Sequence, residues 1–461
     1  MPHLHLLRWL GLGIASPTAA RGDARVVLAS RRMRDPRVIV PFGKPVDADV
    51  QVVGSKSYTN RALVIAALAR GDSELTGALF SDDTRFMSEA LRALGVDVQA
   101  DEAARVLRVR GVAGHVPALT ARCFVGNAGT AARFLPVVMA LGRGVYEIDG
   151  VARMRERPIG PLVGALTRLG VQVEALEKPD CFPLRVHGGS LQGGRVSIAG
   201  HVSSQYVSGL MMGGPAMPRG LTVEIDGDLV SRPYVEMTAQ AMRDFGAHVD
   251  RDGERCFVIH GDPLYAGRRY RVEPDASAAS YFFAAAAITG GRVRVEGLGT
   301  RSLQGDRGFA HILARMGCEV LEGEDFTEVR RARDGGGLRG VEVDMADLSD
   351  VAQTLAVVAP FASSPTRVTG IGFIRAKETD RVAAVVRELT RLGIAATEEK
   401  DGFVVHPGRP GAGAVDTYDD HRMAMSFALL GLQHPGIAIR NPACVSKTFP
   451  DFFERLEALR R

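Results

Sequence analysis

The feature of this sequence that most constrains its fold is an internal repeat. Six segments share one order: a polar turn, a helix of small apolar residues, a Gly-containing break, a strand rich in β-branched residues, a second loop and a second helix. They begin near Gly54, Gly126, Val202, Asp275, Ser349 and Tyr418, at a spacing of roughly 70 to 75 residues. This spacing is long for a solenoid and typical of a compact βαβ-type unit. The repeat therefore predicts an α/β fold of six related units.

The second helix of each unit shows the relationship best. Five units end in the similar stretches ALRALGVDVQ, ALTRLGVQVE, AMRDFGAHVD, ILARMGCEVL and ELTRLGIAAT, whereas the sixth ends in FFERLEALRR. Because 461 residues exceed what one hydrophobic core usually supports, we expect the units to form two larger bodies.

Residues 1–37 precede the repeats and the first strand-like run, VIVPF. Arg8 interrupts their apolar stretch, so they fit a secretory signal peptide poorly, although their composition permits an organelle transit peptide. We expect an N-terminal extension that is disordered, or a start assigned too early with the true start near Met33. The extension is excluded from the predicted fold.

The composition narrows the class of protein. Apolar residues make up 46% of the chain, which is ample for a core, and no stretch is long and apolar enough to span a bilayer. The five cysteines show no CxxC or Cys/His spacing, which favours reduced thiols over disulfides or structural zinc. A net charge of +4 with 6% aromatic residues gives little support for a nucleic-acid groove. We expect a cytoplasmic protein that binds neither nucleic acid nor a membrane.

Lysine is rare in this chain, since only six of the 57 Lys and Arg residues are lysines. Three of the six, Lys56, Lys377 and Lys447, stand in polar turns or loops of the repeats. Lysine is a compact point charge with a tunable pKa, which arginine does not replace. The three lysines are therefore candidates for a functional site.

The first polar turn, GSKSYTNR, carries Lys56, Ser57 and Arg61 directly before the apolar run ALVIAALA, which is predicted to be a buried helix. Unpaired N–H groups and the helix dipole already favour an anion at a helix N-terminus, and added cations strengthen that preference. The turn lacks the first Gly of a P-loop. In isolation a capped helix with surface charge is the commoner structure. The recurrence of such turns instead favours a phosphate or carboxylate site.

Further polar loops supply the remaining candidates. They are Asn127, Gly129 and Thr130 in GNAGTAARF, Arg157 in RMRERP, Ser203, Ser204 and Gln205 in VSSQY, Ser231 and Tyr234 in SRPY, Asp350 in DLSDVAQTL, Lys377, Glu378 and Arg381 in IRAKETDR, Asp420, His421 and Arg422 in YDDHRMAM, and Lys447 in SKTFPDFF. The fourth unit, DASAASYFFAAAA, carries no cation and is expected to be structural.

Each loop also has an ordinary structural explanation. Asp350 is a typical helix cap, and His421 could be a buried histidine with satisfied hydrogen bonds. The arginines of RMRERP could form a solvated charge run, although Pro158 stiffens the segment and could present Arg157 to a cleft.

The cations indicate the charge of the ligands. Seven are candidates: Lys56, Arg61, Arg157, Lys377, Arg381, Arg422 and Lys447. A phosphate ester carries roughly −1.5 to −2 charges near neutral pH, so seven cations suit two ligands that each bear a phosphate and a carboxylate. No HExxH, His/Asp cluster or EF-hand spacing indicates a metal. The residues alone predict a metal-free transferase that binds two phospho-carboxylates between two domains.

Taken together, the motifs resemble those of the enolpyruvyl transferase family, and within it those of the 5-enolpyruvylshikimate-3-phosphate synthases. The matching stretches are GSKSYTNRA, GNAGTAARF, RMRERPI, SSQY, KETDR, YDDHRMAM and KTFPDFF, in this order over almost everything after residue 38. The resemblance implies a two-domain inside-out α/β barrel with three βαβαββ units around a pseudo-threefold axis in each domain. One domain would span 54–272, the other would combine 38–53 with 273–461, and two crossover strands would form the hinge.

The resemblance also implies a reaction. The 5-hydroxyl of shikimate 3-phosphate attacks C2 of phosphoenolpyruvate while C3 is protonated, and the tetrahedral adduct then loses phosphate. No cofactor is consumed, no metal is needed, and the family is usually monomeric.

Roles transfer residue by residue. For shikimate 3-phosphate the resemblance implies Lys56, Ser57, Arg61, Ser203, Ser204, Gln205, Ser231, Tyr234, Asp350 and Lys377. For phosphoenolpyruvate it implies Lys56, Asn127, Gly129, Arg157, Gln205, Arg381, Arg422 and Lys447, with Thr130, Asp420 and His421 in support. Asp350 would accept the hydroxyl proton, Glu378 would protonate the methylene, and Lys56 would assist catalysis.

Two positions qualify the match. Four residues before Lys377 some family members have an Asn that contacts shikimate, whereas this chain has Phe373. Gly129 leaves no methyl group beside the phosphoenolpyruvate site, so we expect glyphosate to bind.

Several alternatives stay open. The UDP-N-acetylglucosamine enolpyruvyl transferases use a Cys in the loop that here reads VARMRERPIG, which has none. A paralogue with another acceptor, an inactive anion-binding or regulatory protein and an RNA-binding relative with repeated units remain.

Overall fold

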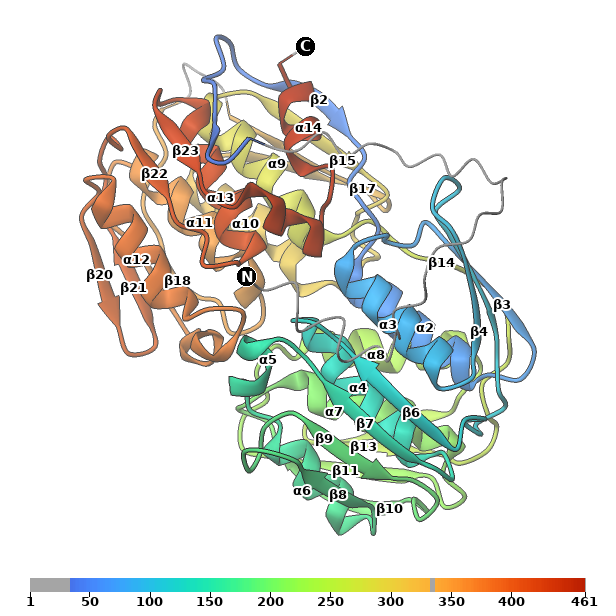
Figure 1. Cartoon of the computed structure of the whole chain (residues 1–461). Coiled ribbons are helices and arrows are strands. Elements are labelled where there is room, and N and C mark those ends of the chain that lie inside the picture. Colours follow the sequence, from blue (N-terminus) through green and yellow to red (C-terminus); the bar gives the residue numbers. More distant parts are fainter. Residues whose placement is uncertain (1–33, 332–335, 461) are drawn as a thin grey trace, which may run out of the picture. The chain divides into compact units, whose positions relative to one another are not determined.

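Six β-sheets carry the fold. The structure is a computed structural model that describes residues 34–331 and 336–460, so most of the predicted extension 1–37 lies outside the described residues. Five sheets have four strands and one has three (Figure 1). Their orders are β14 (Arg269–Arg271), β3 (Asp72–Thr76), β5 (Val106–Arg110), β4 (Asp97–Asp101); β6 (Thr120–Phe124), β7 (Val145–Asp149), β9 (Leu184–His187), β8 (Gln172–Ala175); β10 (Gly194–Ala199), β11 (Leu221–Asp226), β13 (Cys256–Ile259), β12 (Val249–Asp252); β2 (Asp47–Val50), β15 (Arg292–Glu296), β17 (Phe326–Arg330), β16 (Glu319–Glu322); β18 (Glu342–Asp344), β19 (Thr366–Thr369), β21 (Gly402–Val405), β20 (Ala396–Glu399); and β22 (Gly413–Val415), β23 (Ile437–Ile439), β1 (Arg37–Val38).

The sheets share one pattern of strand directions. In each order given above, the first two strands are parallel and every later neighbour is antiparallel. Three sheets take one strand from a distant part of the chain: β14 joins β3, β2 joins β15, and β1 joins β23. Inward residues alternate with outward ones, as Val293 and Val295 do in β15, because successive strand residues point to opposite faces.

Helices connect the strands. They are α2 (Lys56–Leu68), α3 (Asp82–Ala93), α4 (Gly129–Ala140), α5 (Ala152–Glu156), α6 (Gly160–Arg168), α7 (Ser204–Gly213), α8 (Pro233–Asp244), α9 (Ala276–Thr289), α10 (Phe309–Met316), α11 (Ala352–Val358), α12 (Arg381–Arg391), α13 (His421–Ala428) and α14 (Phe452–Ala458). Short 3₁₀ turns include η2 (Gly305–Gly308), η3 (Ser349–Val351), η5 (Gly372–Ala376) and η7 (Pro442–Lys447). The predicted mixed α/β fold is confirmed.

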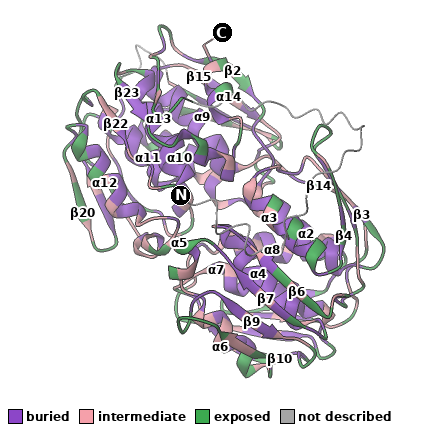
Figure 2. Ribbon diagram, in the orientation of Figure 1, coloured by how far each residue is buried: buried purple, intermediate pink, exposed green. Residues whose placement is uncertain are grey.

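Small-residue helices form much of the core. Helices α4 and α9 are buried at every position, and α2 at all but its first two (Figure 2). Helix α2 contacts α4, α7 and α8, whereas α9 contacts α11. Alanines, such as those in FFAAAA of α9, permit this burial because they lose no side-chain entropy. The prediction that ALVIAALA forms a buried helix is confirmed.

Three further properties bear on the predictions. The five cysteines are free, and four of them are buried. Across the described ranges, no helix has the length and apolarity to cross a bilayer. Residues 34–331 and 336–460 also contain no group of three or more His, Cys, Asp and Glu side chains that could hold a metal ion.

Candidate active site

One cleft gathers most of the side chains predicted for the site. The predicted residues that line it are Lys56, Ser57, Arg61, Thr130, Arg157, Ser203, Ser204, Gln205, Ser231, Tyr234, Asp350 and Lys377. Arg133 and Phe373 line it as well. The cleft therefore joins segments that lie up to about 320 residues apart in the chain.

Helix N-termini supply several of these residues. Lys56, Gly129 and Ser204 are the first residues of α2, α4 and α7. Ser203 caps α7 by accepting a hydrogen bond from the Gln205 amide at 3.3 Å, so this predicted ligand residue is also a helix cap. Helix N-termini carry partial positive charge, and three of them beside one cleft favour an anionic ligand.

Asp350 is the centre of the cationic part of the cleft. Its carboxylate accepts hydrogen bonds from Lys377 Nζ at 2.8 Å, Arg381 Nη1 at 3.1 Å and Arg422 Nη2 at 2.7 Å. Asp350 lies in η3 and caps no helix, because the residues that precede η3 and α11 are Leu348 and Val351. The alternative explanation of Asp350 as a helix cap is therefore wrong.

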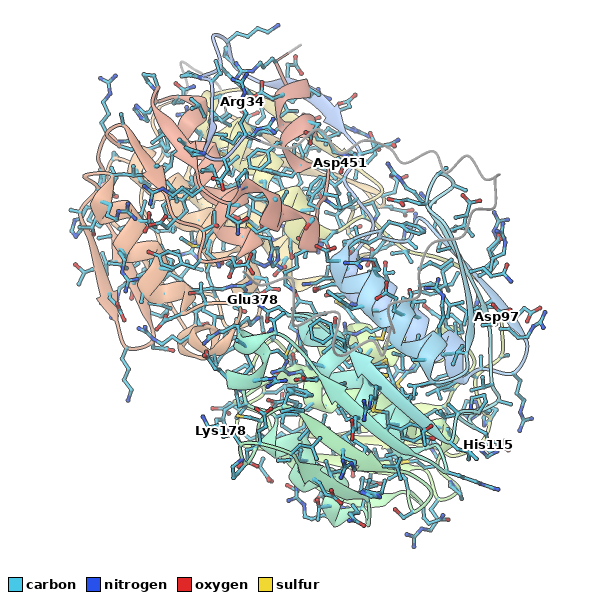
Figure 3. All side chains as sticks on the ribbon, viewed as in Figure 1. Arg34, Asp97, His115, Lys178, Glu378 and Asp451 are labelled. Atoms are coloured by element: carbon cyan, nitrogen blue, oxygen red, sulfur yellow. The ribbon has the colours of Figure 1, made fainter. Side chains whose placement is uncertain are left out.

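Arg381 connects Asp350 to two further carboxylates. Its side chain is 1% exposed and donates to Glu378 Oε2 and to Asp420 Oδ2, both at 2.8 Å. Asp420 also caps α13 by accepting from the Arg422 amide at 2.9 Å. Glu378 is labelled in Figure 3. The predicted acid and the predicted base are thus held by one buried guanidinium.

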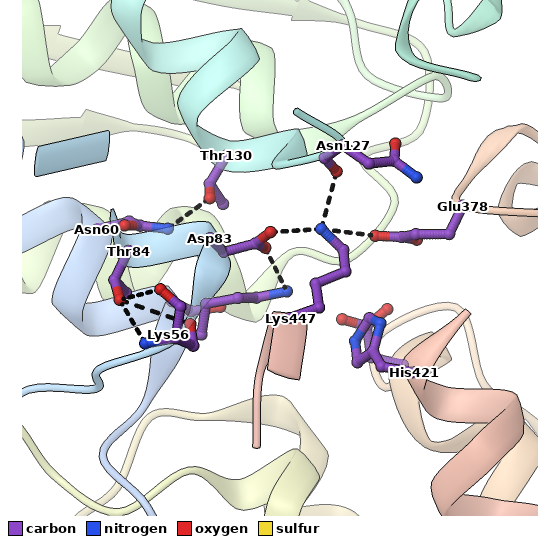
Figure 4. Close-up of polar contacts among 12 residues, drawn as sticks. Lys56, Asn60, Asp83, Thr84, Asn127, Thr130, Glu378, His421 and Lys447 are labelled. Atoms are coloured by element: carbon purple, nitrogen blue, oxygen red, sulfur yellow. Dashed lines mark hydrogen bonds and ion pairs between the residues drawn. The ribbon is translucent and has the colours of Figure 1, made fainter. Parts of the chain in front are cut away.

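Lys447 and Lys56 meet at a carboxylate that the sequence analysis did not assign. Lys447 Nζ contacts Asp83, donates to the Asn127 carbonyl at 2.8 Å and lies 3.8 Å from Glu378 Oε1 (Figure 4). Lys56 Nζ lies 3.4 Å from the other oxygen of Asp83. The Asp83 side chain is only 2% exposed, so both ammonium groups are paired in a largely buried position.

Arg157 faces the start of α4. Its Nη1 donates to the Asn127 side chain at 3.1 Å, and its Nε is buried without a partner within the described part of the chain. A Cβ on Gly129 would lie 2.9 Å from Arg157 Nη2. Gly129 therefore gives the guanidinium the space it occupies. Thr130 accepts from Asn60 at 2.6 Å, which links α4 to α2.

Arg61 is more strongly committed to internal bonds than the sequence suggests. Its guanidinium donates to Thr238 Oγ1, the Ser57 carbonyl, Ser208 Oγ and the Tyr234 carbonyl, at 2.7 to 3.2 Å. A guanidinium has five N–H groups, so one remains for a ligand. Burial lowers the pKa of Arg61 to about 10. Arg61 thus fixes the wall of the cleft.

Ser231 and Tyr234 connect the third repeat to the fourth and fifth. Ser231 has a φ of 53°, and its amide donates to the Ala346 carbonyl at 3.0 Å. The Tyr234 hydroxyl lies 3.2 Å from Asp306 Oδ2 and 3.5 Å from Asp350 Oδ2. These contacts hold the aromatic ring at the side of the cleft.

Comparisons with known proteins decide the family. A family model described as EPSP synthase (3-phosphoshikimate 1-carboxyvinyltransferase) matches residues 40–456. The chain belongs to the EPSP synthase family. It is 46% identical over 421 residues to the 3-phosphoshikimate 1-carboxyvinyltransferase of Trichormus variabilis, covering 91% of this chain and 98% of that relative. The Serratia proteamaculans protein of the same name is 45% identical over 414 residues, 89% of this chain and 96% of the relative. The solved structure of EPSP synthase from Acinetobacter baumannii has a TM-score of 0.76 at 26% identity, covering 92% of this chain and 98% of that one.

In this member of the EPSP synthase family, the site carboxylates are held ionised. Burial would raise the pKa of Asp350, but Arg422, Lys377 and Arg381 more than offset burial and hold that pKa well below its usual range. Burial would likewise raise the pKa of Glu378, which Arg381 and other neighbouring cations lower well below its usual range.

His421 is buried in this EPSP synthase family member but is not the satisfied histidine considered from sequence. Neither ring nitrogen has a hydrogen-bond partner among residues 34–331 and 336–460. Burial and the charges of Arg422 and Lys56 lower the pKa of His421 well below its usual range. The imidazole is therefore neutral, with both nitrogens free to bond a nearby group.

Several residues at the family's site were missed from sequence. Asp83 lies in SDDTRFM, beside the first repeat, and pairs with two predicted lysines. Asp306 contacts Ser277, which lies 3.4 Å from Arg422 Nη2, so the fourth repeat is not merely structural. Arg133 is 3% exposed and lines the cleft.

The missed acids change the charge of the site. The eight cations that belong to it are Lys56, Arg61, Arg133, Arg157, Lys377, Arg381, Arg422 and Lys447, and the five carboxylates are Asp83, Asp306, Asp350, Glu378 and Asp420. Counting cations alone therefore overestimated the positive charge. A surplus of about three positive charges remains, which still favours anionic substrates.

Proposed function

We propose that this chain transfers the enolpyruvyl group of phosphoenolpyruvate to the 5-hydroxyl of shikimate 3-phosphate and releases inorganic phosphate. It is then an enzyme of the shikimate pathway, which leads to the aromatic amino acids. One observation carries the proposal: in a member of the EPSP synthase family, Lys377, Arg381 and Arg422 converge on the single carboxylate of Asp350 in a cleft.

The first step forms a bond between the 5-hydroxyl oxygen and C2 of phosphoenolpyruvate. We assign the acceptor of the hydroxyl proton to Asp350 and the donor of the proton to C3 to Glu378. The cations around Glu378 disfavour its protonated form, so the acid role requires those cations to be offset. The phosphate and carboxylate of phosphoenolpyruvate, bound among the same cations, would raise the pKa of Glu378 towards that of a usable acid.

The second step restores the double bond. C3 gives up a proton, the bond between C2 and the phosphate oxygen breaks, and phosphate leaves. Positive character at C2 in these steps is stabilised by nearby carboxylates, and the leaving phosphate by Arg and Lys side chains. We assign Lys56, Arg157, Arg381, Arg422 and Lys447 to phosphoenolpyruvate, with Asn127, Gly129 and Gln205 beside them.

The remaining side chains are assigned to shikimate 3-phosphate. Ser203, Ser204, Ser231 and Lys377 would bind its phosphate, Ser57 and Arg61 its carboxylate, and Gln205, Tyr234 and Asp350 its ring. Phe373 lies 5.8 Å from Lys377 Nζ, measured to the ring centroid, and lines the same cleft. This side of the cleft offers an aromatic face where an Asn would offer hydrogen bonds.

The division into domains is part of the proposal. Residues Arg34–Arg461 form one compact unit, so the division rests on strand pairing. Pairing of β2 with β15 supports a domain of 38–53 and 273–461, and pairing of β14 with β3 supports one of 54–272. The shared strand order supports six βαβαββ units in two inside-out barrels. We also propose a cytoplasmic monomer, the compartment resting on the five free thiols.

Phosphate release tests the function. The purified chain is given phosphoenolpyruvate and shikimate 3-phosphate together, and each substrate alone as a control. We expect release only when both are present. Release with another acceptor but not with shikimate 3-phosphate would indicate a paralogue, and binding without release would indicate an anion-binding protein.

Replacing Asp350 by Asn tests the assigned base. We expect kcat to fall by about 10²- to 10⁴-fold, the usual contribution of a positioned acid or base. Binding of shikimate 3-phosphate should be kept or tightened, because the site gains one unit of positive charge. Both quantities are measured by steady-state kinetics and calorimetry.

The matched control is Asp416→Asn. Asp416 also pairs with two arginines, Arg391 at 2.7 Å and Arg440 at 2.8 Å, but it lies outside the cleft. Its kcat should stay near that of the unaltered chain. Equal losses of binding and turnover in Asp350→Asn would make Asp350 a structural residue.

A further inference from the structure

Arg153, on α5, bonds to the main chain of a segment more than 220 residues away. Its Nε donates to the carbonyls of Lys377 at 3.1 Å and Glu378 at 3.2 Å. Its Nη2 donates to the same Lys377 carbonyl at 2.9 Å and to the Arg375 carbonyl at 3.4 Å. Only Nη1 is used for a neighbour on its own helix, Glu156, at 2.9 Å. The guanidinium is thus directed at backbone oxygens.

The segment that receives these bonds carries two of the assigned side chains. Lys377 ends η5 and α12 begins only at Arg381, so the residues between them belong to no helix. From this link, Lys377 reaches Asp350 and the Glu378 carboxylate reaches Arg381. A link without its own helical hydrogen bonds depends on outside donors to fix its carbonyls.

The three arginines of RMRERP have different partners. Arg155 pairs with Asp149 and Glu177, which lie near it in the same part of the chain. Arg157 follows α5 and faces Asn127. Arg153 alone of the three contacts the distant link. The interpretation of this stretch as a solvated charge run is therefore wrong for Arg153.

We infer that Arg153 is a positioning residue for the enolpyruvyl transfer. By holding the carbonyls of Lys377 and Glu378 against α5, it fixes the link relative to Arg157, five residues of chain that include both the bridge and a predicted phosphoenolpyruvate ligand. Glu378 then meets the reacting carbon in a set position. This inference rests on the proposed function, because it assigns a purpose to the geometry of that same site.

The test compares Arg153→Met with Arg153→Lys. Methionine keeps an unbranched apolar stem and removes every donor, whereas lysine keeps one charged donor but cannot bridge two carbonyls. A displacement of about 1 Å at a reacting group costs on the order of 10²-fold in rate. We expect kcat to fall about 10- to 100-fold in Arg153→Met and less in Arg153→Lys. Calorimetric affinity for shikimate 3-phosphate alone should change less than about threefold.

Arg168→Met is the matched control. Arg168 also donates to a main-chain carbonyl, that of Ser197 at 2.7 Å, but away from the cleft. Both methionine variants should show similar melting temperatures, and only Arg153→Met should lose kcat. A loss of kcat that tracks a loss of melting temperature, or an unchanged kcat in Arg153→Met, would overturn the inference.

A double-mutant cycle with Glu378→Gln identifies the route of the effect. If Arg153 acts by placing Glu378, then Arg153→Met should cost at most about threefold in the Glu378→Gln background. The same loss in both backgrounds would overturn the inference. Phosphate release by the unaltered chain separates the two claims: without it the proposed function fails, whereas normal release together with an active Arg153→Met fails only the positioning role.

Discussion

At the scale of single residues, the site is governed by charge compensation in places closed to water. Arg381 is 1% exposed and bonds to the carboxylates of Asp350, Glu378 and Asp420. Breaking a buried ion pair by removing one partner typically costs about 3 to 5 kcal/mol, because an uncompensated charge stays behind. A substitution at Arg381 therefore mixes catalytic with structural effects, whereas Arg153 and Asp350 can be probed by variants that keep the surrounding packing.

Asp306 gives a pH-dependent prediction. Burial and the adjacent Asp350 raise the pKa of Asp306 from 3.8 to about 6. Between these two values the folded chain binds a proton that the unfolded chain releases, so this group's contribution to stability is present below about pH 4 and is lost as pH rises to about 6. The loss is on the order of 3 kcal/mol. Asp306→Asn removes it.

The measurement is urea unfolding of both chains from pH 4 to pH 7. We expect the free energy of unfolding of Asp306→Asn to rise relative to that of the unaltered chain as pH increases, with most of the change below about pH 6.5. A difference between the two chains that does not vary with pH would show that Asp306 titrates normally.

At the scale of secondary-structure elements, two chain crossings lie side by side next to the site. The Ser55 amide, before α2, donates to the Glu273 carbonyl at 2.8 Å, and the Lys56 amide donates to Asp275, the cap of α9, at 3.0 Å. Gly54 is required here, because a Cβ would lie 2.0 Å from the Gly77 carbonyl oxygen. The start of α2, and with it Lys56, is therefore placed by the segment that leads into α9.

Gln304 ties these crossings together. Its Oε1 accepts from Ser55 Oγ at 3.0 Å and from the Ala276 amide at 3.1 Å, and its Nε2 donates to the Pro274 carbonyl at 2.7 Å. Gln304→Leu leaves these partners buried without a bond. Because each unsatisfied group costs about 1 to 3 kcal/mol, we expect the free energy of unfolding in urea to fall by about 2 to 4 kcal/mol.

The control for this prediction is Gln172→Leu. Gln172 lies on an exposed position of β8 and bonds only to Glu174, at 2.9 Å, among the contacts of the described chain. Its substitution should change stability by less than about 0.5 kcal/mol. Similar losses in the two variants would mean that Gln304 does not secure the crossings.

At the scale of the whole molecule, ligand binding should add to stability. The cleft draws side chains from α2, α4 and α7 and from residues 350 and 377, so a ligand in it bonds to segments from much of the described chain. At 100 times its dissociation constant, a ligand that binds only the folded state adds about 2.7 kcal/mol to the free energy of unfolding. We expect this increment with shikimate 3-phosphate, measured by urea unfolding.

Two controls accompany that measurement. Shikimate without the phosphate, at the same concentration, should stabilise the chain much less. Replacing Ser203 and Ser204 together by Ala should remove most of the difference between the two ligands. Equal stabilisation by shikimate and its phosphate would contradict the assignment of these serines to the phosphate.

Much of the fold and site could be predicted because the deciding signals are local. The small-residue runs fixed which helices are buried, and the period of the repeat indicated an α/β chain. Motifs around Lys56, Arg157 and Lys377 identified the enolpyruvyl transferase family and most of the side chains that meet in the cleft. These features depend on residues a few positions apart, where spacing alone sets the geometry.

The sequence by itself thus determined the family, the class of fold and the chemical types at the site. Only the tertiary structure decided which charges meet. Asp83 pairs with Lys447 across 364 residues, and Arg153 reaches the Glu378 carbonyl across 225. Asp350 looked like a helix cap because Asp commonly caps helices, yet it binds three cations from later segments. Coulomb and hydrogen-bond energies depend on distance in space, which the order of residues does not specify until the chain has folded.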